Sequence, residues 1–194
     1  MSSSNAISLD PKSTAVVFID LQRGILGMNL TPYSSVEVAS NCASIAEAFR
    51  LKCATVVYVR VDIADILSLP SDAPPLREPN APKPPPEASE IVPESGYQSG
   101  DLLITKRQWG AFYDTGLDQQ LRRRGIKTIV LGGVANNFGV ESTARAAFDL
   151  GYQVVFVEDA MSSVSAEAHK FVVQNIFPRI GRVRNTAEIV ESLT

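Results

Sequence analysis

Short apolar segments rich in β-branched residues recur along the chain, separated by stretches long enough to form helices. Apolar and polar residues hardly alternate within these segments, so both faces of each predicted strand are expected to be covered. That pattern is typical of a parallel sheet lying between two layers of helices. The predicted strands are 14–21 (TAVVFIDL), 54–61 (ATVVYVRV), 101–106 (DLLITK), 127–134 (KTIVLGGV), 153–159 (QVVFVED) and 180–185 (IGRVRN).

Helical periodicity occupies three of the intervening stretches. Residues 36–50 and 140–150 place their apolar side chains on roughly one face, and Gly151 stands where the second of these helices is expected to end. Residues 116–125 predict a shorter helix whose last turn carries Arg122, Arg123 and Arg124. These cations complement the helix dipole and are expected to face water. Strands that alternate with helices indicate a doubly wound α/β fold.

Residues 62–100 interrupt this alternation with nine of the twelve prolines in the chain. Such a segment cannot form a regular helix or a central strand, and parts of it are expected to be polyproline-like. Because the strands on either side belong to one series, and 194 residues suit one domain, we expect a single domain spanning residues 1–194. The proline-rich segment is then a long excursion, packed near the functional site or against another subunit.

Composition narrows the class of partner. Apolar residues make up 45% and charged residues 20% of the chain, which is ordinary for a soluble globular protein. A net charge of -3 argues against nucleic acid as a partner. No apolar run approaches the roughly 20 residues needed to span a bilayer, and the amino terminus lacks the features of a signal peptide. We therefore expect a cytoplasmic protein that acts on a small molecule, with Cys42 and Cys53 as reduced thiols.

Charged residues end two of the predicted strands, at the edge where open parallel sheets bind ligands. Asp20 ends the apolar run of the first strand and Lys106 ends the third strand. A partly buried carboxyl group at Asp20 would resist ionisation unless a cation compensates for the lost solvation. Gln22, two residues on, would point from the same side toward a ligand, and Trp109 and Phe112 could wall a pocket. Position alone also allows a turn-capping aspartate and a lysine that reaches into solvent.

The turn Ala135–Gly139 follows the fourth predicted strand and precedes a helix. Backbone N–H groups at such a turn are unpaired and favour an anion, and Asn137 is a candidate cap for the helix. Gly139 supplies no nucleophile. The turn could therefore hold a carboxylate or a developing oxyanion, but it could form no covalent intermediate.

The sequence predicts neither a metal nor a cofactor. His169 is the single histidine, and no cluster of carboxylates or cysteines accompanies it, so we expect it to be structural. The glycines of LGGVANNFG, residues 131–139, match neither the dinucleotide fingerprint nor the phosphate loop.

Three blocks of the chain together resemble the isochorismatase-like hydrolase superfamily, which includes nicotinamidases and N-carbamoylsarcosine amidohydrolase. They are VVFIDLQ at 16–22, TKRQWGAF at 105–112 and GGVANNFGVESTARAAFDLGYQVVFVEDAMSSVSAEAH at 132–169. The resemblance covers nearly the whole chain. It implies a three-layer, Rossmann-like fold with a six-stranded parallel sheet flanked by helices, and it implies a homo-oligomer.

The same resemblance implies a catalytic triad of aspartate, lysine and cysteine. Asp20 and Lys106 match the first two members, whereas Gly139 stands where the family cysteine precedes VEST. The chain is most similar to a bacterial subgroup that carries this glycine, and true isochorismatases, which cleave a vinyl ether, also have glycine there. A non-proline cis peptide is implied near Val134–Ala135. The metal-binding residues of many nicotinamidases have no counterpart after VRVD, residues 59–62, so again no metal is expected.

The leading hypothesis is a cysteine-independent hydrolase of a small anionic substrate, with isochorismate or a related enol ether as the best candidate. Protonated Asp20 would deliver a proton to the vinyl carbon, while Lys106 would anchor a carboxylate. Amides near Ala135 and Gly139 would hold the other anionic end. Aromatic residues that follow Lys106 would wall the ring.

Two alternatives remain open at this point. One is a binding protein that retains the fold but has lost catalysis together with the cysteine. The other is a hydrolase of a small amide or ester.

Overall fold

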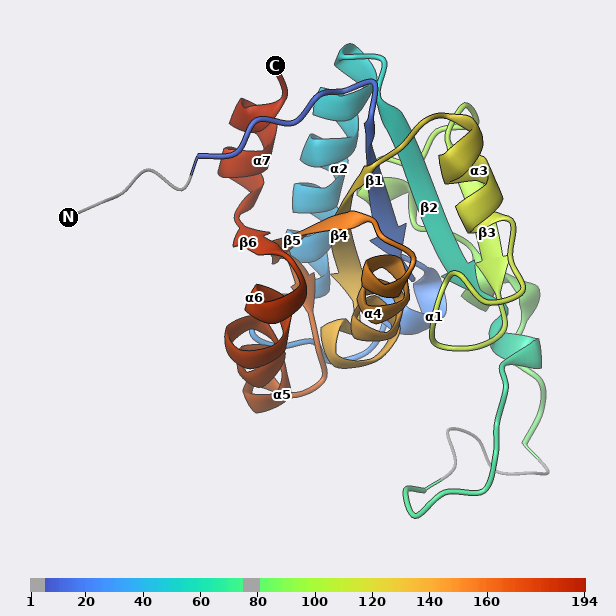
Figure 1. Ribbon diagram of the computed structural model, residues 1–194. Coiled ribbons are helices and arrows are strands. Elements are labelled where there is room, and N and C mark those ends of the chain that lie inside the picture. Colours follow the sequence, from blue (N-terminus) through green and yellow to red (C-terminus); the bar gives the residue numbers. More distant parts are fainter. Residues whose placement is uncertain (1–5, 75–80) are drawn as a thin grey trace.

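A six-stranded, all-parallel sheet forms the centre of the computed structural model, which describes residues 6–74 and 81–194 (Figure 1). The strand order is β3-β2-β1-β4-β5-β6. Each strand coincides with one of the predicted apolar segments, so the α/β fold with a six-stranded parallel sheet is confirmed. The strands are β1 (Thr14–Ile19), β2 (Thr55–Val61), β3 (Leu102–Lys106), β4 (Thr128–Val134), β5 (Gln153–Ser162) and β6 (Arg182–Arg184).

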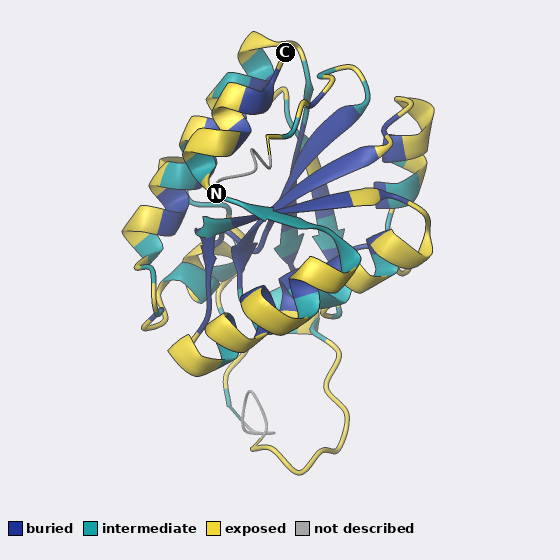
Figure 2. Ribbon diagram, turned by 60° about the vertical axis from the view of Figure 1, so that its left-hand side comes forward, coloured by how far each residue is buried: buried dark blue, intermediate teal, exposed yellow. Residues whose placement is uncertain are grey.

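Helices cover both faces of the sheet. The described α-helices are α1 (Arg23–Leu26), α2 (Ser35–Leu51), α3 (Leu117–Arg123), α4 (Glu141–Asp149), α5 (Ala166–Phe171), α6 (Phe177–Ile180) and α7 (Thr186–Ser192). Val16 and Phe18 of β1 share a core with α2 and α7, whereas Val17 and Ile19 share a core with α3, α4 and α6. Successive strand residues point to opposite faces, so these continuous apolar strands bury both faces. Figure 2 shows the buried strands between helices whose outer surfaces are exposed.

The helices 36–50, 116–125 and 140–150 predicted from periodicity correspond to α2, α3 and α4. A π-helical turn, Asn136–Val140, leads directly into α4. The arginines at the end of α3 are exposed, as predicted. Periodicity did not predict α7, although Asn185 and Glu188 form a capping box at its start, a signal that is visible in the sequence.

The strand order reverses between β1 and β4. From β1 the chain continues to β2 and β3 on one side, and from β4 it continues to β5 and β6 on the other. The carboxyl ends of the two strands are neighbours, because Ile19 pairs with Gly133. Ligands of open α/β sheets bind in the crevice at such a reversal. Asp20 and the turn after β4 both lie at this crevice.

The proline-rich excursion extends beyond the carboxyl ends of the strands (Figure 1). It contains single turns of 3-10 helix but no α-helix or named strand among its described residues, and its residues 75–80 lie outside the described part of the chain. Its returning segment, residues 85–96, pairs with the loop that follows β1. Ile91 bridges to Gln22, and Val92 donates its N–H to the Leu21 carbonyl at 2.9 Å. Part of the excursion therefore lies beside Asp20, as expected for a segment packed near the site.

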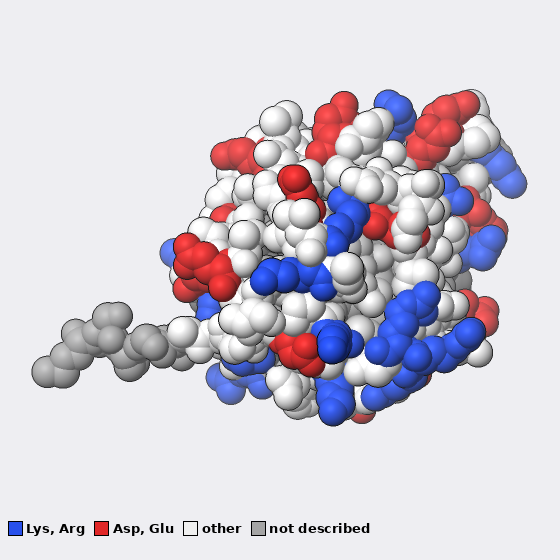
Figure 3. All heavy atoms as spheres, turned by 90° about the horizontal axis from the view of Figure 1, so that it is seen from above, with Lys and Arg blue, Asp and Glu red and all other residues white. Residues whose placement is uncertain are grey.

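Basic and acidic side chains are interspersed over the face at the amino ends of the strands, with a group of basic ones along one edge (Figure 3). Among the residues that the structure describes, no helix is both long enough and apolar enough to span a bilayer.

Gly133, near the end of β4, is in register with Ile19 of β1 and has φ at 113°. A Cβ there would collide with the backbone carbonyl of Ile19, and this φ is one that residues with a side chain rarely adopt. We expect Gly133→Ala to lower the free energy of unfolding by about 3 kcal/mol or more, measured by urea denaturation. Gly100→Ala is the control, because its Cβ would meet nothing within 4 Å. Equal stability of the two variants would contradict this account of the β1–β4 contact.

Candidate functional site

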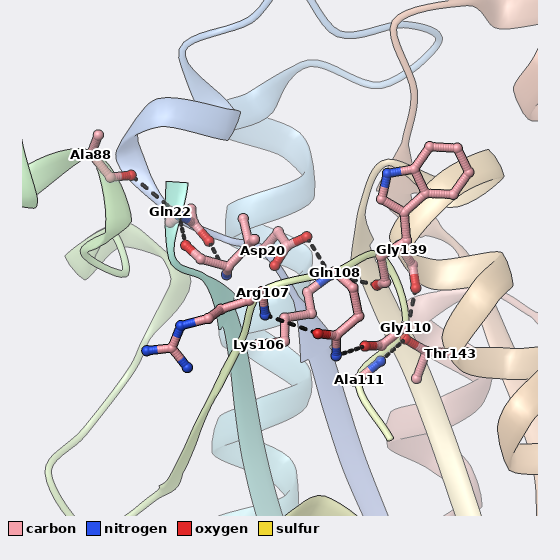
Figure 4. Close-up of polar contacts among 12 residues, drawn as sticks. Asp20, Gln22, Ala88, Lys106, Arg107, Gln108, Gly110, Ala111, Gly139 and Thr143 are labelled. Carbon is pink, nitrogen blue, oxygen red and sulfur yellow. Dashed lines mark hydrogen bonds and ion pairs between the residues drawn. The ribbon is translucent and has the colours of Figure 1, made fainter. Parts of the chain in front are cut away.

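Asp20 and Lys106 form a buried ion pair at the crevice (Figure 4). Nζ of Lys106 lies 2.8 Å from Oδ2 of Asp20, and the two side chains are 1% and 9% exposed. Nζ also donates to the Trp109 carbonyl at 2.7 Å. Lys106 ends β3, two strands away from β1, so its long side chain spans the end of β2 to reach the carboxyl group. The structure thus brings together the two residues that the sequence places at strand ends.

Asp20 leaves β1 in the left-handed backbone region, with φ at 54°. Aspartate enters this region more readily than most residues, although the conformation still costs on the order of 1 kcal/mol. The Asp20 N–H donates to the Val59 carbonyl at 2.8 Å, so pairing with β2 continues past the end of the strand. This backbone turn brings the carboxyl group to the ends of the neighbouring strands, where Lys106 meets it.

Gly139 leaves space directly beside the ion pair. A Cβ at this position would lie 3.1 Å from Lys106 Nζ, 3.2 Å from Asp20 Oδ2 and 3.1 Å from Cγ2 of Ile19. These contacts are tighter than most real Cβ contacts, so any side chain would have to displace a neighbour. The Gly139 carbonyl accepts a hydrogen bond from Thr143 at 2.7 Å, which holds the glycine in place. A small substrate atom near this corner would lie within hydrogen-bonding reach of both charged groups.

The turn after β4 contains the cis peptide Val134–Ala135 that the family resemblance implies. The backbone N–H groups of this turn are less available to a bound anion than the sequence predicted. The N–H groups of Phe138 and Val140 donate to the Ala135 carbonyl at 3.1 and 3.3 Å, so these two cannot also hold an anion. The turn is closed by its own hydrogen bonds because the helix begins with a π-helical rather than an α-helical turn.

Burial gives the Asp20 carboxyl group its acid–base character. Desolvation raises its pKa to about 6, and it outweighs the opposing effect of Lys106, which lowers the pKa. Oδ1 of Asp20 is buried and has no hydrogen-bond partner among the described residues. Asp20 can therefore carry or release a proton near neutral pH.

A cavity of about 240 Å³ opens onto the ion pair and is lined mainly by apolar side chains. Trp109 and Phe138 pack edge to face in its wall, with ring centroids 5.0 Å apart, and they are 53% and 40% exposed. Of the described residues in the lining, Asp20 and Lys106 are the charged ones. The lining comprises Asp20, Ile25, Met28, Val61, Ile66, Lys106, Gln108, Trp109, Val134, Ala135, Phe138, Gly139 and Val164.

A larger groove of about 690 Å³ runs between α2 and residues 92–98. Neither Asp20 nor Lys106 lines it. We place the functional site in the smaller cavity, because that cavity combines a buried carboxyl group with a raised pKa, a cation and an unpaired oxygen atom.

Three residues predicted to contact the substrate lie outside this cavity. Phe112 is buried in the core against Tyr152, with ring centroids 5.8 Å apart. Asn137 does not cap the helix, because its side-chain oxygen accepts a hydrogen bond from Ser163 at 2.6 Å. Gln22 is fully buried and bonds to backbone groups. Phe138, which the sequence analysis missed, takes the place intended for Phe112; its position directly before Gly139 was the available signal.

Neither cysteine of the chain lines the cavity. Cys42 is buried in α2, where its thiol donates to the Ala160 carbonyl at 3.4 Å and burial raises its pKa. Cys53 is exposed and precedes β2, at the opposite end of the sheet from the crevice. Among the residues that the structure describes, no group of three or more His, Cys, Asp or Glu could hold a metal ion.

The protein is therefore of the α/β class, with an aspartate and a lysine that meet beside a glycine at the strand-order reversal. A sequence model described as "Isochorismatase domain" matches residues 14–188, and the chain belongs to the isochorismatase family.

Two relatives are similar over nearly their whole lengths. The isochorismatase family protein YwoC of Bacillus subtilis (strain 168) is 46% identical over 192 residues, which cover 97% of this chain and 98% of the relative. YecD of Escherichia coli O157:H7, described in the same terms, is 43% identical over 199 residues, covering 96% and 100%. A solved isochorismatase family protein from Burkholderia thailandensis superposes with a TM-score of 0.89 at 42% identity, covering 97% and 99%.

The opposing effects on Asp20 can be separated by removing the charge of its partner. Lys106→Met keeps the length of the side chain but removes the ammonium group, so the pKa of Asp20 should rise above its value of about 6. A ¹³C NMR titration of the aspartate carboxyl carbons measures this value, with Asp20→Asn identifying the signal. A lower or unchanged pKa in Lys106→Met would contradict the electrostatic description of the pair.

Proposed function

We propose that this protein is a hydrolase of small anionic substrates that uses the Asp20 carboxyl group as a proton donor and needs no cysteine nucleophile. The observation that carries the proposal is the buried carboxyl group with a pKa of about 6, paired with Lys106 and facing a cavity in which none of the described lining residues carries a thiol. A vinyl ether such as isochorismate is the substrate type that suits this arrangement best, because its cleavage requires a proton rather than a nucleophilic side chain.

The reaction begins with transfer of the Asp20 proton to the terminal vinyl carbon, which leaves an oxocarbenium ion and an Asp20 carboxylate. Water adds to the oxocarbenium carbon and returns a proton to Asp20. The resulting hemiketal breaks its bond to the ring oxygen and yields pyruvate and the ring alcohol. One water is consumed, and the carboxyl group ends in its starting state, as general acid–base catalysis requires.

Lys106 is the group that anchors the substrate. An ammonium group has three N–H donors, and two of them bond to Asp20 and to the Trp109 carbonyl. The third is available to a substrate carboxylate. When Asp20 is protonated, the pair carries one net positive charge, which favours a bound anion, and that anion in turn raises the pKa of Asp20.

The aromatic wall made by Trp109 and Phe138 would hold the ring of the substrate. Both side chains line the cavity and retain exposed surface for contact. Their edge-to-face arrangement orients the two rings differently, so one face is available for stacking and one edge for lateral contact.

The test is pyruvate release from isochorismate by the purified protein, followed with lactate dehydrogenase. Because the protonated carboxyl group is the active form, kcat/KM should be highest below pH 6 and fall about tenfold per pH unit above it. Asp20→Asn should reduce the rate by about 10²- to 10⁴-fold. If the unmodified protein releases pyruvate no faster than Asp20→Asn does, the vinyl-ether proposal is wrong.

Hydrolysis of a small amide or ester is the second candidate. It is favoured by the position of Gly139, because a Cβ added there would lie 3.1 Å from Lys106 Nζ and 3.2 Å from Asp20 Oδ2. A thiolate in that place would lie between a general base and a cation, the surroundings that activate a cysteine nucleophile.

Gly139→Cys distinguishes the two candidates. If the site is that of an amide or ester hydrolase, this variant should hydrolyse small amides or esters faster than the unmodified protein, and the gain should disappear in the Gly139→Cys, Lys106→Met double variant. Gly139→Ser serves as the control for side-chain size. If the protein instead binds without catalysis, neither the variant nor the parent will turn over amides, esters or enol ethers, although ligands will still raise the Tm.

A further inference from the structure

The outer part of the cavity is lined by apolar side chains that remain exposed. Four separate segments supply them: Met28 follows α1, Trp109 follows β3, Phe138 lies in the turn after β4, and Val164 follows β5. We call these four residues the apolar wall. Exposed apolar side chains that gather in one hollow commonly mark a binding site, because a bound apolar group removes their surface from water.

Hydrogen bonds between loops hold the wall in place. Thr31 and Ser163 exchange both backbone hydrogen bonds, at 2.7 and 3.1 Å, so the loop that carries Met28 pairs with the segment that carries Val164. The Ser163 hydroxyl donates to the Asn137 side chain at 2.6 Å, which connects the same segment to the turn after β4. The wall is therefore preformed, as is usual for small-molecule sites.

Polar groups next to the wall form hydrogen bonds within the protein. Nε2 of Gln108 donates to the carbonyl groups of Gly110 and Tyr113 at 3.0 and 2.8 Å, and its Oε1 accepts the Arg107 N–H at 3.3 Å. Two N–H groups of the turn after β4 donate to the Ala135 carbonyl. A charged substituent that reached the wall would lose its water without gaining these donors.

The ion pair at the inner end of the cavity can bind one anionic group. Lys106 has one N–H left after its bonds to Asp20 and to the Trp109 carbonyl. With Asp20 protonated, the pair carries one net positive charge. Lys106 is the one cation among the described residues that line the cavity. A second carboxylate on the substrate would therefore face the apolar wall.

We propose that the apolar wall selects enol ethers whose alcohol part is an apolar ring, with Val164 as a specificity-determining residue. The inference rests on the proposed function, because it takes vinyl-ether hydrolysis by Asp20 as the reaction. The substrate's single carboxylate binds Lys106. Water is consumed, the bond between the former vinyl carbon and the ring oxygen breaks, and the apolar ring leaves as the alcohol. Isochorismate has a second carboxylate on its ring, so it should be a poorer substrate than an enol ether without one.

The first test compares 2-phenoxyacrylate with 2-(3-carboxyphenoxy)acrylate, which share the reacting enol ether and differ by one ring carboxylate. Hydrolysis of either compound gives pyruvate and a phenol. For the unmodified protein, kcat/KM should be at least about tenfold higher for 2-phenoxyacrylate, because a carboxylate placed against apolar side chains loses its solvation. Equal values, or a preference for the dicarboxylate, would overturn the inference.

Binding of unreactive analogues separates this selectivity from the proposed reaction. Phenoxyacetate and 3-carboxyphenoxyacetate keep the carboxylate, the ether oxygen and the ring but have no vinyl group, so their Kd values do not depend on catalysis. Isothermal titration calorimetry should show phenoxyacetate binding at least about tenfold more tightly. If this difference is found but neither acrylate is hydrolysed, the proposed reaction is wrong and the selectivity of the wall stands. Equal Kd values, or no binding of phenoxyacetate at millimolar concentration, would contradict the inference.

The role of Val164 is tested by placing a cation in the wall. Val164→Lys should reduce the preference for phenoxyacetate over the dicarboxylate by about five- to tenfold, because the new ammonium group can pair with the ring carboxylate. Val164→Ile keeps the wall apolar and should retain the preference. Val190→Lys is the matched control, since this valine is also exposed but lies on α7, outside the cavity lining. An unchanged preference in Val164→Lys, or an equal change in Val190→Lys, would overturn the assignment.

Discussion

The buried ion pair between Asp20 and Lys106 requires three separate segments of the chain to be positioned together. Removing two charged groups from water costs several kcal/mol for each ion, and the attraction between them compensates only when they are in close contact. Here the contact distance is 2.8 Å, the Trp109 carbonyl takes a second proton of the ammonium group, and Gly139 leaves the space that the pair requires. The end of β1, the end of β3 and the turn after β4 must therefore be positioned together.

The parallel sheet meets this demand through its topology. The strand order reverses between β1 and β4, which places Asp20, at the end of β1, beside the turn that follows β4. Only β2 separates β1 from β3, so Lys106 can reach Asp20. The returning segment of the proline-rich excursion pairs with residues 21–23, directly after Asp20. A segment that looks irregular in sequence is in this way part of the support of the site.

The same desolvation that makes the pair costly also gives Asp20 its chemistry. An aspartate carboxyl group in water has a pKa of 3.8, whereas burial raises the pKa of Asp20 to about 6 despite the adjacent ammonium group. None of the described residues that line the cavity carries a thiol, and the reagent that we propose is the Asp20 proton. This is the physical basis for our proposal of acid-catalysed cleavage rather than covalent catalysis.

The sequence by itself determined the layers of the fold, the six strands, and the placement of Asp20, Lys106 and Gly139 at strand ends. These features follow from local patterns, because apolar periodicity and chain order decide which residues end a buried strand. The roles of Gln22, Phe112 and Phe138 were decided only by the tertiary structure. Gln22 bonds to groups 39 and 66 residues away, and no local pattern reveals which backbone will stand there.

Likewise, Phe112 and Phe138 are both aromatic residues close in sequence to site residues. Phe112 packs against Tyr152 in the core, whereas Phe138 lies in the cavity wall. The pKa of Asp20 belongs to the same category. It reflects the balance between burial and one nearby cation, and that balance exists only after the distant segments have come together.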